Sequence, residues 1–180
     1  VAGQTAPGEG ITVYGNGVSF SGANNTIVRY LRFRMGVGGD SGKDAAGVAN
    51  GTNMIFDHLS VSWGRDETFS ISSDGKGDLG NIAIQNSIMS QGLLTHSAGG
   101  LMQADNITLY RNLYADNSTR NNKIKGKNQY VNNIVYNWQN GKDGPWDKFV
   151  KRIGTEPVIY DSSKVEESVE NITNRLEYLG

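Results

Sequence analysis

Alternating apolar and polar positions recur along the first three quarters of the chain, and each run begins at an asparagine. Within a run the apolar residues lie two positions apart, which is the period of a β-strand and not of a helix. The asparagines are 28, 28, 25 and 22 positions apart, and a large apolar residue stands three positions after each. The asparagines are Asn25, Asn53, Asn81, Asn106 and Asn128, and the apolar residues are Val28, Phe56, Ile84, Leu109 and Val131. This repeated strand predicts an all-β fold.

The short, glycine-rich connections between the runs favour a solenoid of parallel strands. A helical crossover needs about a dozen residues, and some of the gaps are too short for one. The chain has 24 glycines and 3 prolines, so it can turn often. A second polar track follows at His58, Asn86, Asn112 and Asn133, with one residue of slippage. Because stacked coils would align such residues in ladders, we expect a parallel β-helix. An antiparallel sandwich with similar strand spacing is the alternative.

The last part of the chain has a different pattern. Residues 145–180 hold 12 charged residues and two glycines, whereas residues 1–144 hold the other 22 glycines. Ser163 and Glu166 form a capping-box sequence. Apolar residues then follow on one helix face, at Val165, Val169, Ile172, Leu176 and Leu179. We therefore predict β-helix coils over 1–144, and a charged C-terminal tail over 145–180 with an amphipathic helix at about 163–179.

Composition and charge exclude several classes of protein. Lys and Arg number 17 against 18 Asp and Glu, so the net charge of −1 lacks the overall positive charge of a nucleic-acid-binding protein. The absence of cysteine excludes disulfides, thiolate zinc sites and a cysteine nucleophile. No run approaches 18 consecutive apolar residues. We expect a monomer with no nucleic-acid partner and no membrane span. The abrupt change of pattern near residues 141–147 also predicts a longer native protein.

Three segments together resemble the pectate lyase superfamily, polysaccharide lyase family one. They are NMIFDHLSVSWGRDETFSI at residues 53–71, RNNKIK at residues 120–125 and the strand QYVNNIVY at residues 129–136. The resemblance covers roughly residues 1–140 and rests on the order and spacing of these segments. It implies a right-handed parallel β-helix, secretion, a calcium cofactor and cleavage of polygalacturonate, an acidic polysaccharide, by β-elimination.

The chemistry of such a reaction explains why these residue types are needed. Elimination removes the C5 proton of a 1,4-linked uronic acid, and the charged carboxylate beside C5 makes that proton only weakly acidic. A hard cation held by protein carboxylates can neutralise the substrate carboxylate through oxygen ligands. A base then takes the proton while positive side chains stabilise the negative charge that develops.

For the calcium ligands, the resemblance implies Asp44 and Asp66, with Glu67 adjacent to the second. The third family position falls on Ser70, which is a poorer ligand than aspartate. We therefore expect either a lowered calcium affinity or the substitution of Glu67 for the missing carboxylate. Asp40 is a further candidate ligand. The alternative is that these acids only solvate glycine-rich loops.

For the reaction itself, the resemblance implies that Arg120 is the base and that Lys125 and Lys123 bind substrate. Asn122 stands where the family has a proline. A guanidinium base is chemically unusual, because arginine is protonated in nearly all proteins. His96 lies near a position at which the family often carries a substrate-binding Lys or His. The alternative for these residues is a solvated or structural role.

Local charge is consistent with a polyanionic partner. Residues 111–127 contain five cations and one acid, for a local charge of +4 in a nearly neutral chain. We expect His58 to hydrogen-bond between coils and not to act in catalysis. Trp63 and Trp138 are expected to pack at coil ends, with sugar stacking as the alternative.

Three other functions on the same fold stay open. A pectin lyase acts on a methyl ester and needs no acidic cluster, whereas this chain has Asp44 and Asp66. A β-helical glycoside hydrolase needs two placed carboxylates. A non-catalytic carbohydrate-binding or adhesin solenoid needs neither arrangement. Formation of an unsaturated product separates a lyase from the last two.

Overall fold

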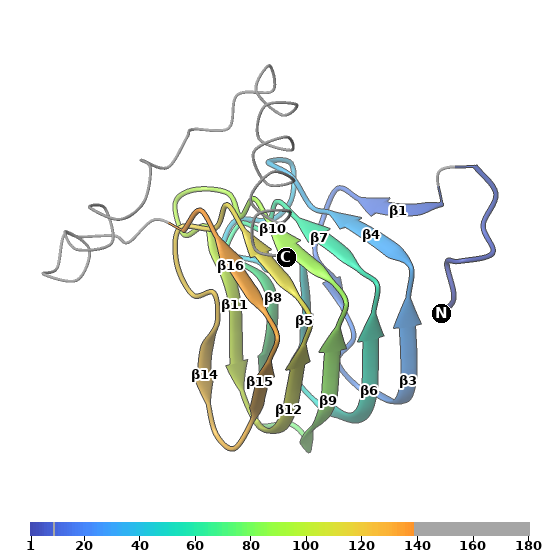
Figure 1. Ribbon diagram of the computed structural model, residues 1–180, viewed down its shortest axis with the longest axis vertical. Coiled ribbons are helices and arrows are strands. Elements are labelled where there is room, and N and C mark those ends of the chain that lie inside the picture. Colours follow the sequence, from blue (N-terminus) through green and yellow to red (C-terminus); the bar gives the residue numbers. More distant parts are fainter. Residues whose placement is uncertain (9, 139–180) are drawn as a thin grey trace, which may run out of the picture. The chain divides into compact units, whose positions relative to one another are not determined.

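A computed structural model of the protein describes residues 1–8 and 10–138. Within these residues the chain forms sixteen β-strands in three parallel sheets, so the predicted parallel β-helix is confirmed (Figure 1). The described residues contain no helix that is long and apolar enough to cross a membrane. The predicted tail and its helix at about 163–179 lie outside the described residues.

Each full coil contributes one strand to each sheet, in the order C, A, B. Sheet C contains β2 (Val18–Ser19), β5 (Ala46–Val48), β8 (Glu67–Ser72), β11 (Ala98–Gln103) and β14 (Lys123–Lys125). Sheet A contains β3 (Ala23–Arg29), β6 (Gly51–Asp57), β9 (Leu79–Gln85), β12 (Asp105–Tyr110) and β15 (Gln129–Val131). Sheet B contains β1 (Ile11–Tyr14), β4 (Leu31–Arg34), β7 (Ser60–Ser62), β10 (Ile88–Ser90), β13 (Leu113–Ala115) and β16 (Ile134–Tyr136).

The apolar positions that follow each asparagine form a column inside sheet A. Val28, Phe56, Ile84 and Leu109 are paired in register from coil to coil and are fully or almost fully buried. In the last described coil Leu109 is in register with Tyr130 and not with Val131, and these two side chains are 39% and 42% exposed. The predicted register of the fifth run was therefore wrong by one residue, because the shortened last coil shifts the pairing.

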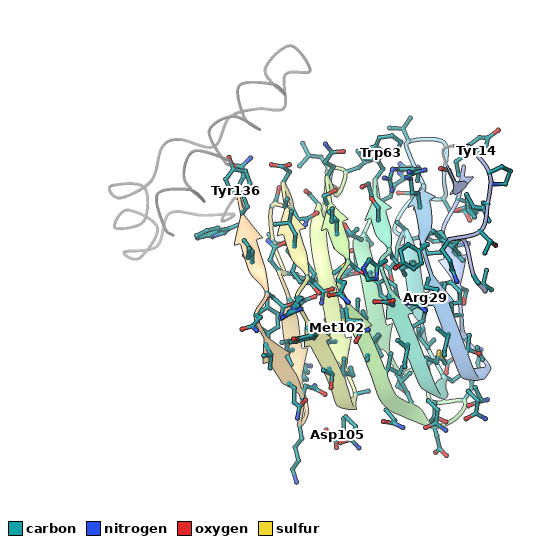
Figure 2. All side chains as sticks on the ribbon, turned by 45° about the vertical axis from the view of Figure 1, so that its right-hand side comes forward. Tyr14, Arg29, Trp63, Met102, Asp105 and Tyr136 are labelled. Atoms are coloured by element: carbon teal, nitrogen blue, oxygen red, sulfur yellow. The ribbon has the colours of Figure 1, made fainter. Side chains whose placement is uncertain are left out.

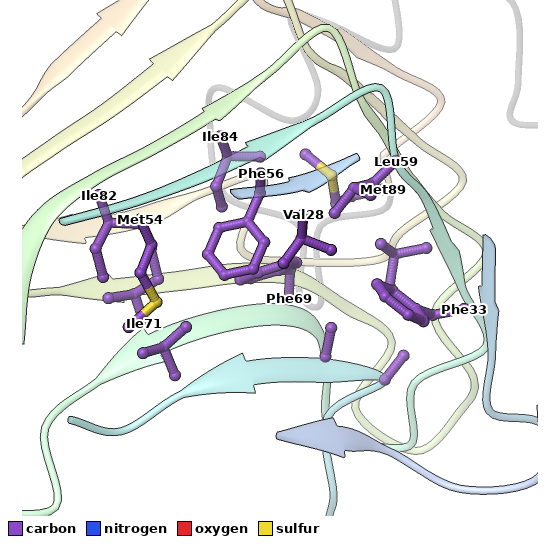
Figure 3. Close-up of a cluster of buried hydrophobic side chains, with 14 of the residues drawn as sticks. Val28, Phe33, Met54, Phe56, Leu59, Phe69, Ile71, Ile82, Ile84 and Met89 are labelled. Carbon is purple, nitrogen blue, oxygen red and sulfur yellow. The ribbon is translucent and has the colours of Figure 1, made fainter. Parts of the chain in front are cut away.

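The core is filled by side chains that point inward from all three sheets (Figure 3). Phe56 of sheet A meets Phe69 of sheet C edge to face, with ring centroids 5.1 Å apart. Phe20 packs against the same Phe56 ring at 5.0 Å. Such geometry suits the quadrupoles of aromatic rings. Each buried side chain of this size contributes about 1.5–3 kcal/mol to stability. The apolar surface buried when one coil stacks on the next therefore offsets the conformational entropy lost on ordering the coil.

The leading asparagines form the predicted ladder on the outer side of sheet A. Asn25, Asn53 and Asn81 have φ values of 51°, 59° and 53°, in the left-handed region that asparagine tolerates better than most residues. The amide of Asn53 donates to the side-chain oxygen of Asn25 at 3.0 Å, and Asn81 donates to Asn53 at 2.6 Å. Asn128 plays a different part, since its side-chain oxygen accepts the N–H of Ile107 at 2.8 Å.

The second polar track proves to be two columns, which explains its slippage of one residue. His58 and Asn86 occupy the left-handed corner between sheets A and B, with φ values of 51° and 48°. Asn112 and Asn133 stand one position later and point inward. The oxygen of Asn133 accepts the N–H of Asn112 at 2.9 Å, and the oxygen of Asn112 accepts the N–H of Ser87 at 3.0 Å. These bonds satisfy backbone donors that the turn would leave unpaired.

The buried carboxylate of Asp57, at the end of β6, holds together the turn between sheets A and B through four side-chain contacts. Asp57 lies 2.7 Å from the guanidinium of Arg29 and 2.8 Å from Nδ1 of His58. Gln85 and Asn86 donate to it at 3.1 Å and 3.0 Å. Burial raises the pKa of Asp57, but these four hydrogen bonds outweigh burial and hold the pKa well below its usual range. The charged carboxylate therefore stabilises the fold at neutral pH.

We expect Asp57→Asn to lower the free energy of unfolding at pH 7 by about 2–4 kcal/mol, because buried donors lose a charged acceptor. The folded-state pKa of Asp57 lies below the unfolded value of about 3.9, so this contribution is present above about pH 4 and is lost as the pH falls further. Urea unfolding at pH 7 and pH 3 measures both effects. Asp78→Asn, at an exposed position, is the control; equal losses in the two variants would contradict this role.

Candidate metal and substrate site

Three carboxylates meet where two coils enter sheet C. Asp44 lies just before β5, Asp66 lies just before β8, and Glu67 is the first residue of β8. Their ligand atoms all lie within 4.8 Å of one another. Stacking brings them together, because the N–H of Ala45 donates to the carbonyl of Glu67 at 3.1 Å, and the N–H of Asp66 donates to that of Lys43 at 2.9 Å. The three residues named as calcium ligands from the sequence are thus adjacent.

Each of these carboxylates hydrogen-bonds to a different side chain, and the guanidinium of Arg120 also lies 4.0 Å from Asp66. The hydroxyl of Ser70 donates to Asp44, whose other oxygen accepts the N–H of Glu67 at 3.0 Å. Nδ1 of His96 lies 2.7 Å from Asp66. The guanidinium of Arg120 forms an ion pair with Glu67. The acidic cluster is therefore surrounded by one hydroxyl, one imidazole and one guanidinium.

The electrostatics of the cluster favour a cation. The side chain of Glu67 is only 4% exposed. Burial raises its pKa, and the negative charges of Asp44 and Asp66 raise it further, to about 7, although the hydrogen bond from Arg120 opposes the shift. Three close carboxylates with one paired guanidinium retain an excess of negative charge. Their oxygens are the ligand type that calcium prefers, so the donor set fits that ion.

Arg120 is positioned by the start of β11. It has a left-handed φ of 51°, and its carbonyl accepts the N–H of Gly100 at 2.6 Å. A Cβ at Gly99 or Gly100 would collide with the side-chain oxygen of Asn121 or Asn122, respectively. The two glycines thus let the Arg120 turn lie directly against β11. Sequence reasoning missed this support, although paired glycines inside a strand are a signal of close backbone approach.

Lys123 and Lys125 lie on β14, at the outer face of sheet C. Lys123 is in register with Leu101, which is in register with Ser70. Lys125 is in register with Gln103 in the same way, and both lysines are exposed. Residues in register on parallel strands share a face. The lysines therefore lie on the same face as the hydroxyl that contacts Asp44, two strands away.

Other candidates from the sequence lie apart from this cluster. Asp40 pairs with Lys43 at 2.6 Å and is not among the three clustered carboxylates. His58 contacts Asp57 of its own coil and stacks on Tyr30 of the preceding coil, with ring centroids 4.6 Å apart. The backbone N–H of His58 donates to the carbonyl of Gln85 in the next coil at 3.2 Å, which is a hydrogen bond between coils as expected. The side chain of His58 instead contacts the preceding coil through the ring stack and bonds within its own coil.

The two tryptophans differ in their surroundings. Trp63 lies just after β7 and is 39% exposed (Figure 2); its indole N–H donates to Gln91 of the next coil at 3.0 Å, and the guanidinium of Arg34 lies 5.8 Å from its ring centroid. Trp138 is 41% exposed and lines a pocket together with Arg120 and Lys123. Sugar stacking stays a prediction for both tryptophans, and Trp138 is the one that lies beside Arg120.

Curated proteins from several fungi are similar to this chain. A protein of Aspergillus flavus named "Probable pectate lyase C" is 66% identical over 142 residues, which cover 78% of this chain and 33% of that protein. A protein of the same name from Aspergillus fumigatus has the same identity and coverage. That of Aspergillus terreus is 57% identical over 171 residues, which cover 92% of this chain and 40% of its own length. The chain thus spans a third to two fifths of these relatives. No family model matches the sequence.

The role of Ser70 can be tested by restoring a carboxylate. We expect Ser70→Asp to lower the melting temperature in chelator, because a fourth negative charge lies beside Asp44. In excess calcium the same variant should gain more thermal stability than the wild type and bind calcium about tenfold more tightly. Thermal melts and calorimetric titration measure both. Ser72→Asp adds the same charge on the same face, where Ser72 contacts Gln103. An identical calcium response in the two variants would argue against the Ser70 position as a ligand site.

Proposed function

We propose that this chain, which belongs to the pectate lyase family, is part of a secreted enzyme that cleaves 1,4-linked polygalacturonate by calcium-assisted β-elimination. The observation that carries this proposal is the meeting of three carboxylates with Arg120 beside a face that bears two exposed lysines. A polyuronate can bind to both the acidic and the basic groups of this site. A cation would bridge its carboxylates to the acidic cluster, and positive side chains would bind other carboxylates directly. An acidic polysaccharide is therefore the substrate class that suits the site.

Asp44, Asp66 and Glu67 would hold the calcium ion. All three offer hard oxygen ligands from two adjacent coils, and Glu67 is buried behind the other two. When bound there, calcium would neutralise a substrate carboxylate and so make the neighbouring C5 proton more acidic. Ser70 would orient Asp44 through its hydroxyl, and His96 would orient Asp66.

Arg120 is proposed to take the C5 proton. The bond between C4 and the glycosidic oxygen then breaks, a C4–C5 double bond forms, and the departing oxygen is protonated. A base must first give up its own proton, which a carboxylate partner opposes. Arg120 would therefore act only when Glu67 is engaged by the cation instead of the guanidinium. Glu67 is shared by the ion pair and the acidic cluster, so it couples the two.

The remaining cations are proposed to bind the polymer. Lys123 and Lys125 present two exposed ammonium groups on sheet C. Their strand, β14, lies about 4.8 Å from β11 of the neighbouring coil. They would contact substrate carboxylates on either side of the scissile bond. His96, which is 57% exposed, would reach the same sugars from the start of β11.

The alternatives differ from this proposal in their products. A hydrolase would release reducing ends without an unsaturated sugar, and a carbohydrate-binding or adhesin solenoid would release neither. A pectin lyase would form the unsaturated product from the methyl ester without calcium. The product and its metal dependence therefore separate the four functions.

The first test uses the full-length protein and polygalacturonate. We expect ultraviolet absorbance of an unsaturated product to appear, to vanish in excess chelator and to return on titration with calcium. Asp44→Asn should need at least about tenfold more calcium, because the cluster loses one ligand charge. Asp40→Asn, at the exposed residue paired with Lys43, should not. Full activity in excess chelator would favour an ester substrate or another mechanism.

The second test concerns the base. We expect Arg120→Lys to keep the positive charge but lose the forked geometry, so that kcat falls about 10²–10⁴-fold while KM changes little. Lys125→Ala should mostly raise KM. Arg111→Lys is the matched control, since Arg111 lies over the ring of Tyr110 in another part of the coil. Near-normal kcat in a correctly folded Arg120→Lys protein would leave Arg120 as a polyanion contact only.

A further inference from the structure

Four asparagines among the described residues stand in the sequence Asn-x-Ser/Thr. They are Asn24, Asn50, Asn106 and Asn117, which are followed two positions later by Thr26, Thr52, Thr108 and Thr119. This triplet is the acceptor sequence for N-linked glycans in proteins that pass through a eukaryotic secretory pathway. The triplets alone do not distinguish the four sites, but the surroundings of their amide nitrogens do.

Asn117 cannot carry a glycan in this fold. Its side chain is buried, at 1% exposure. Its amide nitrogen donates to the carbonyl of Met89 at 3.0 Å and to the side-chain oxygen of Asn121 at 3.1 Å, so both amide hydrogens are used. The amide oxygen accepts the N–H of Gly92 at 3.0 Å. A sugar on this nitrogen would break a core hydrogen bond and has no space.

Asn24 and Asn50 have amide nitrogens that are partly engaged. That of Asn24 donates to the carbonyl of Gly22 at 3.3 Å, and that of Asn50 donates to Asp74 at 3.1 Å. Asn106 differs from both. Its side chain is exposed. No residue that the structure describes hydrogen-bonds to its side-chain amide, so neither hydrogen of that amide is held by the described part of the protein.

The asparagine ladder ends before Asn106. Asn25, Asn53 and Asn81 are joined across coils of 28 residues, and in each bond the side-chain amide donates to the asparagine of the preceding coil. The pairing of Ile107 with Ile82 places Asn106 opposite Asn81, but the spacing between these two asparagines falls to 25 residues. Among the described residues no hydrogen bond joins the side-chain amide of Asn106 to Asn81, so this amide does not continue the ladder. Asn106 keeps the left-handed φ of the ladder, at 56°, without its side-chain bond.

We propose that Asn106 carries an N-linked glycan, an inference that rests on the proposed secretion of the enzyme. The host transferase would move an oligosaccharide from a lipid-linked pyrophosphate donor to Asn106. The bond between the anomeric carbon and the pyrophosphate oxygen breaks, the bond from that carbon to Nδ2 forms, and the amide loses one proton. The products are the glycosylated amide, the lipid pyrophosphate and a proton.

The position of Asn106 keeps this glycan away from the catalytic face. Asn106 lies on β12 of sheet A, whereas the acidic cluster and the lysines lie on sheet C. Ile107 is fully buried, so the side chains on either side of it in the strand point outward. Asn106 lines a groove on sheet A together with Ile27 and Ile55, which are 53% and 39% exposed. The glycan would shield this exposed apolar column from solvent and from other chains.

Site-specific mass spectrometry of the full-length protein, secreted from a filamentous fungus behind a fungal secretion signal, tests the proposal. We expect the Asn106 peptide to carry hexose and N-acetylhexosamine, and the Asn117 peptide to be unmodified. Thr108→Val should abolish the modification at Asn106, because it removes the acceptor hydroxyl while keeping the side-chain shape. Thr108→Ser, which keeps the hydroxyl, should retain it. Activity on polygalacturonate should be unchanged in both variants.

The outcomes separate this inference from the proposed function. An unmodified Asn106 in secreted protein, or a glycan on Asn117, would overturn the inference even if the protein is an active lyase. A modified Asn106 in a protein that forms no unsaturated product would support the inference and contradict the proposed function. A modification that persists in Thr108→Val would show attachment by another route and would also overturn it.

Discussion

Parallel pairing between successive coils is the constraint on which the other features of this structure depend. Strands of neighbouring coils are in register, so each residue lies about 4.8 Å from its equivalent in the next coil. Inside the β-helix, equivalent positions hold similar apolar side chains that stack in columns, such as Val28, Phe56 and Ile84. At the turns, equivalent positions hold asparagines, which tolerate a left-handed backbone and form side-chain hydrogen bonds from one coil to the next.

The same constraint concentrates charge at the entrance to sheet C. Asp44 and Glu67 begin adjacent coils, so stacking forces their carboxylates together, with Asp66 beside them. Burial, together with this crowding, raises the pKa of Glu67 to about 7. Donors from three later positions, Ser70, His96 and Arg120, offset part of the repulsion. The fold thus supplies a negatively charged site with a guanidinium at its edge, and the proposed calcium chemistry on a polyuronate would use both.

Much of the fold could be predicted from the sequence because strand period and coil period are local and regular. The ladder from Asn25 to Asn81 follows directly from a repeat of 28 residues. The fifth coil could not be placed, since shortening of the repeat moved the position in register with Leu109 from Val131 to Tyr130. Periodicity carries no information about such a shift until the pairing partners are known.

The candidate site was predictable in its residue types but not in its contacts. Family resemblance placed Asp44, Asp66 and Glu67 together, and their ligand atoms do converge. The ion pair between Arg120 and Glu67 joins residues 53 positions apart. At the position expected for a third metal ligand, Ser70 instead donates a hydrogen bond to Asp44. Both depend on which coil stacks on which, and on the glycines that let Arg120 approach.

A crystal structure of the full-length protein with calcium and a slowly cleaved oligogalacturonate would test the proposed site most directly. We expect a calcium ion bound by Asp44, Asp66 and Glu67, a sugar carboxylate completing its ligands, and Arg120 turned from Glu67 toward C5 of that sugar. An oligosaccharide bound on another sheet, or an ion pair between Arg120 and Glu67 that persists beside the bound sugar, would contradict this expectation.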